Sequence, residues 1–453
     1  MNKADVIIIG GSAAGLAAAN AGKTSYPDKE FLLLRKEELV MVPCGIPYIF
    51  GSLETSEQNV LPADAMYDKL GIHHQQSEVQ SIDSENKKVV LEDGKTIEYD
   101  KLVLATGSKP KVPSWLHGTD LENVFTIPKN KIYLDKMRDK LASANKIVTI
   151  GAGFIGVEIS DEFAKSGKDV TLVEKLPSVL SVAFDTEIAS KAGEILEKNG
   201  VRVKTGKGVR ELVGDNGKVS KVILEDGNEI EADAVILSMG YEANSDLAKK
   251  AGLNLEVNNT ISVDEYMRTS DPDIIAVGDC AEKRHFVTRK LTNTMLASTA
   301  CAEGRIAGMN LFKLSVVKTF SGTISIYSTA IRDHALGTAG VTEREAKAEG
   351  FDIITGYFEG MDRHPGKLPN MHHQAVKLIV ARESGIIIGA EAIGGESVGE
   401  LTNLLGFIVQ NRTSIQNLVT SQIGTHPMLT GSPAAYPLMK AAEMAYSKLR
   451  NRK

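Results

Sequence analysis

The chain has few cysteines, no long apolar run and no strong excess of charge of either sign. Three cysteines in 453 residues are too few for a disulfide framework, and no two of them have metal-ligand spacing. No apolar run approaches the roughly 20 residues that span a membrane. A net charge of −6 gives no reason to expect nucleic acid or an anionic membrane as a partner. These absences point to a globular protein without disulfides, a metal site or membrane spans.

The rest of the composition is ordinary for a globular protein, with 42 % hydrophobic and 24 % charged residues. A chain of this length predicts two to four domains. The N-terminal stretch MNKADVIIIGG enters an apolar strand at once, which predicts that there is no signal peptide. Together with the scarcity of cysteine, this favours a reducing cytoplasm as the location.

A glycine-rich loop follows directly after that first apolar run. In ADVIIIGGSAAGLAAAN, residues 6–9 predict a buried parallel strand, and the alanine-rich stretch after the loop predicts a helix. A strand, a tight turn and a helix in this order bind a pyrophosphate through the free N–H groups of the helix N-terminus. A serine stands at the middle position of the G-x-G-x-x-G pattern and is small enough for close approach. The predicted pyrophosphate-binding residues are Gly10, Gly11, Ser12, Ala14 and Gly15.

A second loop of this kind carries the complete glycine pattern. NKIVTIGAGFIGVEISDEFAKSGKDVTLVEK contains a strand at 147–150, an amphipathic helix and a strand at 170–173. The second strand ends in Glu174, where a carboxylate is expected to receive the ribose hydroxyls of a dinucleotide. Two such units in one chain predict two bound dinucleotides. The predicted binding residues of this unit are Gly151, Gly153, Phe154, Ile155, Gly156 and Glu174.

Three further segments complete the pattern. YDKLVLATGSKP (99–110) and ADAVILSMGYEANSDLA (232–248) each join an apolar strand to a glycine turn, and PDIIAVGDCAE (272–282) ends its strand at Gly278 and Asp279. Together with the two loops, these motifs in this order resemble the pyridine nucleotide-disulfide oxidoreductases. Members of that family bind FAD with one unit and NAD(P)H with the other. The resemblance covers nearly the whole chain.

The resemblance implies an α/β fold with two Rossmann-like dinucleotide-binding domains, for FAD and NADH, and a C-terminal α+β dimerisation domain. The implied ranges are 1–115 and 245–320 for FAD, 116–244 for NAD(P)H and 321–453 for dimerisation. NADH is expected to be preferred over NADPH, because Glu174 would repel a 2′-phosphate. Asp279 would bind the ribityl chain of FAD, and Glu158 would lie near the nicotinamide. Further implied cofactor-binding residues are Ala105, Thr106, Gly107, Gly240 and Gly278.

One position departs from the family pattern. An acid is expected about 19 residues past Gly15, at the end of the second strand of the FAD unit. That position is Leu34, so the adenosine ribose lacks its usual carboxylate there. Glu37 or Glu38, just beyond, are the candidates to replace it, and otherwise the contact is lost.

Cys44, in VPCGIPYIFG, lies where the family's redox cysteines lie beside the flavin. Two-cysteine members have a second cysteine nearby, but the corresponding positions here are Leu39 and Ile49. The chain therefore resembles the single-cysteine branch, which comprises coenzyme A-disulfide reductases, NADH oxidases and peroxidases, and persulfide or polysulfide reductases. If the segment opens a helix, the helix dipole is expected to lower the pKa of the Cys44 thiol. Cys280 and Cys301 are interpreted as structural.

The sequence leaves the electron acceptor open. Peroxidases of this branch carry a histidine in the first loop, where this chain has Ala13 and Ala14, and coenzyme A-disulfide reductases carry an asparagine where this chain has Pro43. The interpretation is an NADH-dependent FAD enzyme that reduces a small thiol disulfide or persulfide through Cys44. Coenzyme A disulfide, coenzyme A persulfide and polysulfide all fit that class. The alternatives are an NADH oxidase that reduces oxygen and, from another class, a flavin-based redox sensor or scaffold.

The C-terminal segment resembles the family's dimerisation domain. Its tail contains His426 followed by proline, which resembles the catalytic His-Pro of two-cysteine members, but the glutamate expected five residues later is Gly431. Tyr436 resembles the tyrosines that single-cysteine members send across the dimer interface. The resemblance implies a homodimer in which His426 and Tyr436 of one subunit serve as acid–base groups at Cys44 of the other.

Overall fold

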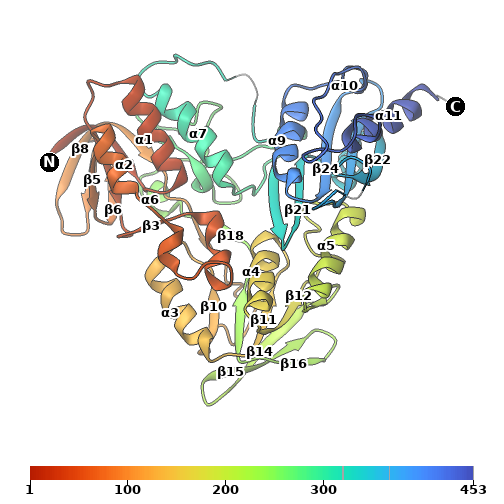
Figure 1. Ribbon diagram of the computed structural model, residues 1–453. Coiled ribbons are helices and arrows are strands. Elements are labelled where there is room, and N and C mark those ends of the chain that lie inside the picture. The colour runs from red at the N-terminus through yellow and green to blue at the C-terminus, as the bar shows by residue number, and fades with distance from the viewer. Residues whose placement is uncertain (319–320, 367, 452–453) are drawn as a thin grey trace.

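The computed structural model describes residues 1–318, 321–366 and 368–451. Figure 1 shows three lobes: the N-terminal region and α7 at the upper left, the middle of the chain below, and the C-terminal region at the upper right. The predicted ranges 245–320 and 321–453 include positions 319–320, 367 and 452–453, which lie outside the described residues. The predicted α/β fold class is confirmed, because mainly parallel sheets with helices form two lobes and an antiparallel sheet with helices forms the third.

The first lobe is built on a sheet with the strand order β5-β2-β1-β8-β7-β6, and β19 pairs with β8. The pairs β1–β2, β1–β8, β2–β5 and β8–β19 are parallel. The first four residues of β2 form a buried apolar run and most of β1 is buried as well, as expected for parallel strands covered on both faces. The strands are β1 (Lys3–Ile9), β2 (Phe31–Arg35), β5 (His73–Gln76), β6 (Val79–Asp83), β7 (Lys88–Leu91), β8 (Thr96–Leu104) and β19 (Ile274–Ala276).

Two helices of the first lobe, α1 (Ala13–Ser25) and α7 (Ala297–Met309), pack closely against each other (Figure 1). Their backbones approach so closely that a Cβ atom on Gly304 would lie 2.5 Å from the carbonyl oxygen of Ala14. Small residues on both helices permit this distance. The contact fixes the N-terminus of α7 relative to the first glycine-rich loop. The shorter helices of this lobe are α2 (Ala63–Leu70) and α6 (Asp246–Lys250).

The second lobe repeats the parallel plan with the strand order β10-β17-β11-β12-β13. A small antiparallel sheet, β14-β15-β16, lies at the lower end of the molecule in Figure 1. The pair β9–β18 is formed where the chain passes between the first two lobes. The strands are β9 (Ser108–Pro110), β10 (Val124–Thr126), β11 (Lys146–Ile150), β12 (Asp169–Val173), β13 (Val201–Lys204), β14 (Val209–Asp215), β15 (Lys218–Leu224), β16 (Glu229–Glu231), β17 (Ala234–Leu237) and β18 (Tyr241–Ala243). The helices are α3 (Lys131–Ala142), α4 (Phe154–Lys165) and α5 (Thr186–Lys198).

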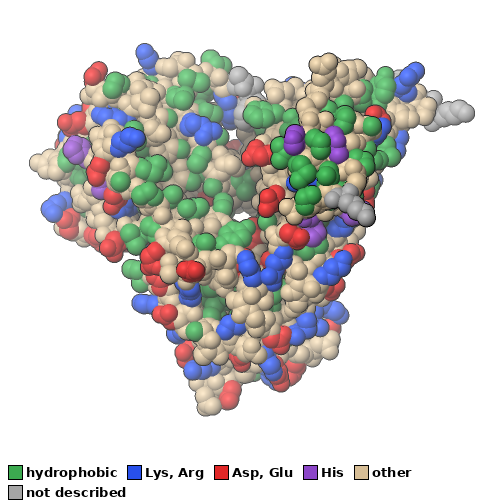
Figure 2. All heavy atoms as spheres, viewed as in Figure 1, with side chains coloured by type: hydrophobic (Ala, Val, Ile, Leu, Met, Phe, Trp, Pro, Cys, Tyr) green, Lys and Arg blue, Asp and Glu red, His purple; other side chains and the backbone are tan. Residues whose placement is uncertain are grey.

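The third lobe contains an antiparallel sheet with the order β20-β21-β24-β23-β22. Its strands are β20 (Tyr327–Ile331), β21 (His334–Gly340), β22 (Ile353–Met361), β23 (His373–Ala381) and β24 (Ile387–Gly394). Its helices are α8 (Glu343–Ala348), α9 (Ser397–Gln410), α10 (Ile415–Val419) and α11 (Pro437–Arg450). Across the part of the chain that the structure describes, no helix combines the length and apolar character needed to cross a membrane. On the face drawn in Figure 2, acidic and basic side chains are interspersed.

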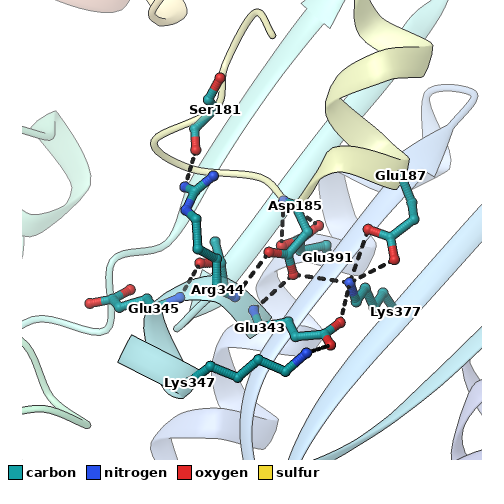
Figure 3. A network of polar contacts seen from close by, with 10 residues as sticks. Ser181, Asp185, Glu187, Glu343, Arg344, Glu345, Lys347, Lys377 and Glu391 are labelled. Atoms are coloured by element: carbon teal, nitrogen blue, oxygen red, sulfur yellow. Dashed lines mark hydrogen bonds and ion pairs between the residues drawn. The ribbon is translucent and has the colours of Figure 1, made fainter. Parts of the chain in front are cut away.

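A buried lysine joins the second and third lobes (Figure 3). The Lys377 side chain is 2 % exposed, and its ammonium lies 3.1 Å from Asp185, 3.0 Å from Glu187 and 2.8 Å from Glu343. Glu391 beside it accepts hydrogen bonds from the backbone N–H of Asp185. Burial and the Asp185 carboxylate raise the pKa of Glu391 well above its ordinary value. One ammonium therefore pairs with carboxylates that come from both lobes.

Replacing Lys377 by methionine is expected to destabilise the protein strongly. The variant leaves Asp185, Glu187 and Glu343 without their shared cation, and loss of one partner of a buried ion pair costs about 3–5 kcal/mol. Lys347, which is 63 % exposed and pairs with Glu343, provides the matched control. Lys347→Met should cost less than about 1 kcal/mol. Denaturant unfolding of both variants measures the two costs, and equal values would show that the buried lysine has no special role.

Candidate functional site

The first glycine-rich loop is packed tightly between the ends of β1 and β8. Gly10 has a φ of +112°, and a Cβ atom there would lie 2.2 Å from the carbonyl oxygen of Ala105. α1 begins at Ala13, directly after Ser12, so its first N–H groups have no partner within the helix. The predicted Ala14 and Gly15 lie in the first turn of α1. The loop therefore presents free N–H groups where a pyrophosphate can bind.

A cavity of about 940 Å³ opens beside this loop. Its walls include the predicted segments Gly10–Ser12 and Ala105–Gly107, together with the end of β2 and Lys129. The predicted Gly278 packs against α1, because a Cβ atom there would lie 2.7 Å from Cβ of Ala14. The size of the cavity and the unpaired N–H groups at one end suit a dinucleotide such as FAD.

Asp279, which the sequence predicted as a cofactor-binding residue, has two polar partners that the sequence analysis did not predict. Its carboxylate accepts a hydrogen bond from the Ser108 hydroxyl at 2.8 Å and pairs with the Lys129 ammonium at 2.8 Å. Burial by itself would raise the pKa of Asp279, but the positive charge of Lys129 holds the pKa below its ordinary value. Ser108 directly follows the predicted Gly107, so the same motif could have been used to predict it. Lys129 belongs to no motif, so only the fold reveals it.

The second glycine-rich loop has the same construction. Gly151 has a φ of +97°, a Cβ atom there would lie 2.4 Å from the carbonyl oxygen of Ser238, and α4 begins at the predicted Phe154. Glu174 accepts hydrogen bonds from the N–H groups of Ala152 at 2.7 Å and Leu176 at 2.8 Å. These bonds hold the carboxylate against the loop. The remaining predicted residues of this unit lie in the loop, in the first turn of α4 and between β17 and β18: Gly153, Ile155, Gly156 and Gly240.

The strand register corrects the position expected for the acid of the first unit. The N–H of Gly151 donates to the carbonyl of Val173, and the N–H of Gly10 donates to the carbonyl of Leu34, each at 2.8 Å. Glu174 directly follows Val173, so its counterpart in the first unit is Arg35. The sequence prediction missed this position by one residue, because spacing alone does not show the register of the strands. Leu34 itself is buried in the core.

Cys44 lies in a 3₁₀ turn, η1 (Pro43–Gly45), and a second 3₁₀ turn, η2 (Pro47–Phe50), follows it. These two turns replace the expected helix. The expectation of a pKa lowered by that helix was wrong, since each turn is too short to carry a substantial dipole. The thiol is exposed on one side and enclosed by protein on the other, and this enclosure, with the Glu158 carboxylate, raises the pKa of Cys44. The Lys129 ammonium and a hydrogen bond with the backbone N–H of Ala297, at the start of α7, act in the opposite direction.

Glu158, on α4, accepts a hydrogen bond from the Thr329 hydroxyl at 2.7 Å. Burial, with a smaller contribution from the Glu162 carboxylate, raises the pKa of Glu158 to about 7. The side chain can therefore hold or release a proton near neutral pH. Thr329 lies on β20, so the third lobe helps to position a residue of the second. Thr329 was not predicted, because no local pattern relates it to Glu158.

The two predicted tail residues do not meet Cys44 within one chain. Among the described residues, no hydrogen bond or ion pair joins His426 or Tyr436 to the cysteine. His426 is exposed, and its Nδ1 accepts a hydrogen bond from the N–H of Met428 at 3.2 Å. Tyr436 is half-buried against the core of the third lobe, and burial raises its pKa. Their proposed roles depend on a second subunit.

Comparison with known proteins gives the family. Residues 4–304 match the pyridine nucleotide-disulphide oxidoreductase family, and residues 326–435 match the dimerisation domain of pyridine nucleotide-disulphide oxidoreductases. The chain belongs to this family. The predicted family and enzyme class, with FAD and a nicotinamide nucleotide as cofactors, are confirmed at this level. The match to the dimerisation domain indicates a homodimer.

Several relatives cover nearly the whole chain. An NADH oxidase from Methanocaldococcus jannaschii is 32 % identical over 98 % of this chain and 99 % of its own. An NAD(P)H coenzyme A polysulfide/persulfide reductase from Pyrococcus horikoshii is 31 % identical over 91 % and 92 %. Among solved structures, an NAD-dependent persulfide reductase from A. fulgidus superposes with a TM-score of 0.91 at 31 % identity, covering 98 % of this chain and 84 % of that one. A water-forming NADH oxidase from Lactobacillus brevis gives a TM-score of 0.90 at 27 % identity, covering 99 % of each.

The charges around Cys44 predict how its reactivity depends on pH. Only the thiolate is alkylated, so the rate of alkylation by iodoacetamide in flavin-free protein should rise through a pKa above that of an ordinary cysteine. Glu158 is charged above pH 7, so Glu158→Gln should lower the apparent pKa of Cys44 by removing a negative charge. Lys129→Met should raise it. Rates are measured in a Cys301→Ser background, and a pKa that is the same in all variants would refute this assignment.

Proposed function

We propose that the protein is an FAD-dependent oxidoreductase that passes electrons from NADH, through the flavin and Cys44, to a small thiol disulfide or persulfide. Coenzyme A disulfide, coenzyme A persulfide and polysulfide are the candidate acceptors. The observation that carries this proposal is an exposed, unpaired Cys44 beside Lys129, Asp279 and Glu158. The reducing chemistry and the three free cysteines support a location in a reducing cytoplasm.

The residues present fit the proposed cofactors. The Gly10 loop and the N-terminus of α1 would hold the FAD pyrophosphate, and Asp279 would bind the ribityl chain. The Gly151 loop would hold the NADH pyrophosphate, with Glu174 on the adenosine ribose. FAD, when bound, supplies a two-electron relay between a nicotinamide and a sulfur. NADH is proposed over NADPH, because the Glu174 carboxylate lies beside the loop where a 2′-phosphate would meet it.

The chain's own groups are suited to sulfur chemistry. The Cys44 thiolate attacks one sulfur of the acceptor, forms a mixed disulfide and expels the other sulfur as a thiolate. Lys129 and the Ala297 N–H stabilise negative charge on the Cys44 sulfur. Two electrons that originate from NADH, with one proton, then convert the mixed disulfide to a free thiol and the Cys44 thiolate. Glu158 is placed to supply a proton, because its pKa is about 7.

A second candidate is reduction of oxygen. The relationship to the NADH oxidase from M. jannaschii, at 32 % identity over nearly the whole chain, favours it. Rapid mixing of the NADH-reduced protein with coenzyme A disulfide, polysulfide and oxygen in parallel separates the candidates. Fast oxidation by a sulfur acceptor supports the proposal, and fast oxidation by oxygen alone supports the oxidase. Slow oxidation by every acceptor would indicate the flavin-based sensor.

Replacing Cys44 by serine should separate the two half-reactions. The variant should retain FAD and still be reduced by NADH, since hydride transfer to the flavin needs no sulfur. Turnover with disulfide or persulfide should fall by orders of magnitude, because a hydroxyl is a far weaker nucleophile than a thiolate. Cys301→Ser serves as the control and should leave both half-reactions unchanged. Wild-type sulfur turnover in Cys44→Ser would mean that Cys44 is structural.

The proposal includes active sites that are shared between two subunits. His426 and Tyr436 of one subunit would act as acid–base groups at Cys44 of the other. Exposure of the tail in the single chain supports this arrangement, since Met428 is 40 % and Leu429 is 62 % exposed beside His426. Figure 2 shows histidine and hydrophobic side chains together on the C-terminal lobe. Apolar side chains at the surface of a domain that dimerises are expected to be covered by the second subunit.

Subunit complementation tests the shared site. Cys44→Ser is mixed with a His426→Ala/Tyr436→Phe double variant under conditions that exchange subunits. Each parent should reduce sulfur acceptors poorly, since proton transfer by a positioned side chain typically contributes about 10²–10⁴-fold. Each heterodimer should regain one intact site out of two. Absence of recovery despite demonstrated exchange would show that the tail and Cys44 do not act together.

A further inference from the structure

The two nucleotide-binding units carry opposite charges at the same position. In the first unit Ile9 pairs with Leu34, and in the second Ile150 pairs with Val173, so the next residues, Arg35 and Glu174, are equivalent. Both side chains lie over their loops. A Cβ atom on Gly11 would lie 3.2 Å from Cδ of Arg35, and Glu174 accepts a hydrogen bond from Ala152, the counterpart of Gly11. The first unit therefore has a cation where the second has its ribose-binding acid.

Arg35 is already bound to the protein. Its side chain is 7 % exposed, and the guanidinium pairs through two nitrogens with the Asp64 carboxylate on α2. Its Nε donates to the carbonyl of Glu37, and its Nη2 donates to the carbonyl of Glu38, each at 3.0 Å. A guanidinium also has no acceptor atom for a ribose hydroxyl. Arg35 thus holds the chain that follows β2 and does not replace the missing acid.

The chain that Arg35 holds brings a different carboxylate to the cavity. Glu37 is half-buried and lines the 940 Å³ cavity together with Gly10 and Gly11. Within residues 1–318, 321–366 and 368–451, no group donates a hydrogen bond to its carboxylate. Glu38 lines only the smaller neighbouring cavity, and Glu78, which lines both, pairs with Lys36 at 3.5 Å. Asp246 also lines the cavity, but its side chain is 79 % exposed and lies 4.0 Å from the Lys109 ammonium. Glu37 is therefore the half-buried carboxylate next to the end of β2 whose acceptor atoms are free.

We propose that Glu37, placed by the Arg35–Asp64 pair, accepts hydrogen bonds from the ribose hydroxyls at the adenosine end of the bound flavin nucleotide. The inference rests on the proposed function, because it requires FAD in the first unit. Two vicinal hydroxyls suit a carboxylate, which offers two acceptor oxygens. In the second unit the acid occupies the position equivalent to Arg35, whereas in the first unit it lies two residues further along the chain, at Glu37. Arg35 is a positioning residue in this arrangement.

Release of FAD from the full-length holoprotein tests the role of Glu37. The protein is diluted, and the release of FAD is followed by the rise in flavin fluorescence. Glu37→Gln should weaken FAD binding by about 10- to 100-fold, as expected for the loss of charge-assisted hydrogen bonds. Glu38→Gln, the matched control, should change binding by less than about twofold. Arg35→Met should weaken FAD binding about as much as Glu37→Gln. Because Arg35 acts through Glu37, the double variant Arg35→Met/Glu37→Gln should bind FAD no more weakly than either single variant.

A flavin analogue makes the test specific for the ribose. FAD is exchanged for an excess of the analogue with 2′-deoxyadenosine, which lacks one ribose hydroxyl. The wild-type protein should bind the analogue more weakly than FAD, whereas Glu37→Ala, which has no acceptor atom at this position, should bind both equally. If Glu37→Gln binds FAD like the wild type, or if Glu37→Ala still prefers FAD over the analogue, the inference is overturned. If the wild-type protein binds no FAD, the proposed function itself fails, so the two failures are distinguishable.

Discussion

The arrangement of the site depends on the close contact between each glycine-rich loop and the neighbouring strand end. At Gly10 and Gly151 a side chain would collide with a carbonyl oxygen, at 2.2 Å and 2.4 Å. Because these two residues have none, the loops lie against the sheet and the helices behind them begin at Ala13 and Phe154. The free N–H groups of both helices thus point to the edge where the strands end. The proposed pyrophosphate contacts of both cofactors are made at these two loops.

Contacts between lobes determine the rest of the site. Thr329, from the third lobe, binds Glu158 on the second, and the buried Lys377 joins carboxylates of both lobes. Ala297, at the start of α7, reaches Cys44 because α7 is packed against α1. The electrostatic environment of the cysteine is therefore assembled from segments that extend from Cys44 to Ala297 in the chain. No single motif contains it.

The two nucleotide-binding units share one fold but differ in the residue that follows the same point of the second strand. The second unit keeps an acid at the end of its second strand, whereas the first has Arg35 there and neutralises it with Asp64. A buried guanidinium would be costly without such a partner. The ion pair with Asp64 is therefore what allows an arginine at the position where the second unit has Glu174. Arg35 also holds the backbone of the residues that follow it. The loop after β2 can then offer a carboxylate from a new position.

The sequence by itself determined the family, the two loops and the position of Cys44, because each of these depends on neighbouring residues whose order is visible in the chain. Apolar runs, glycines at fixed spacing and a lone cysteine are local signals. The tertiary structure decided what spacing does not encode: that Arg35 and not Leu34 occupies the acid position, that Cys44 lies in 3₁₀ turns, and that Lys129 pairs with Asp279. Strand register and the pKa of a thiol depend on groups that meet only after folding, since charge and burial act through space and not along the chain.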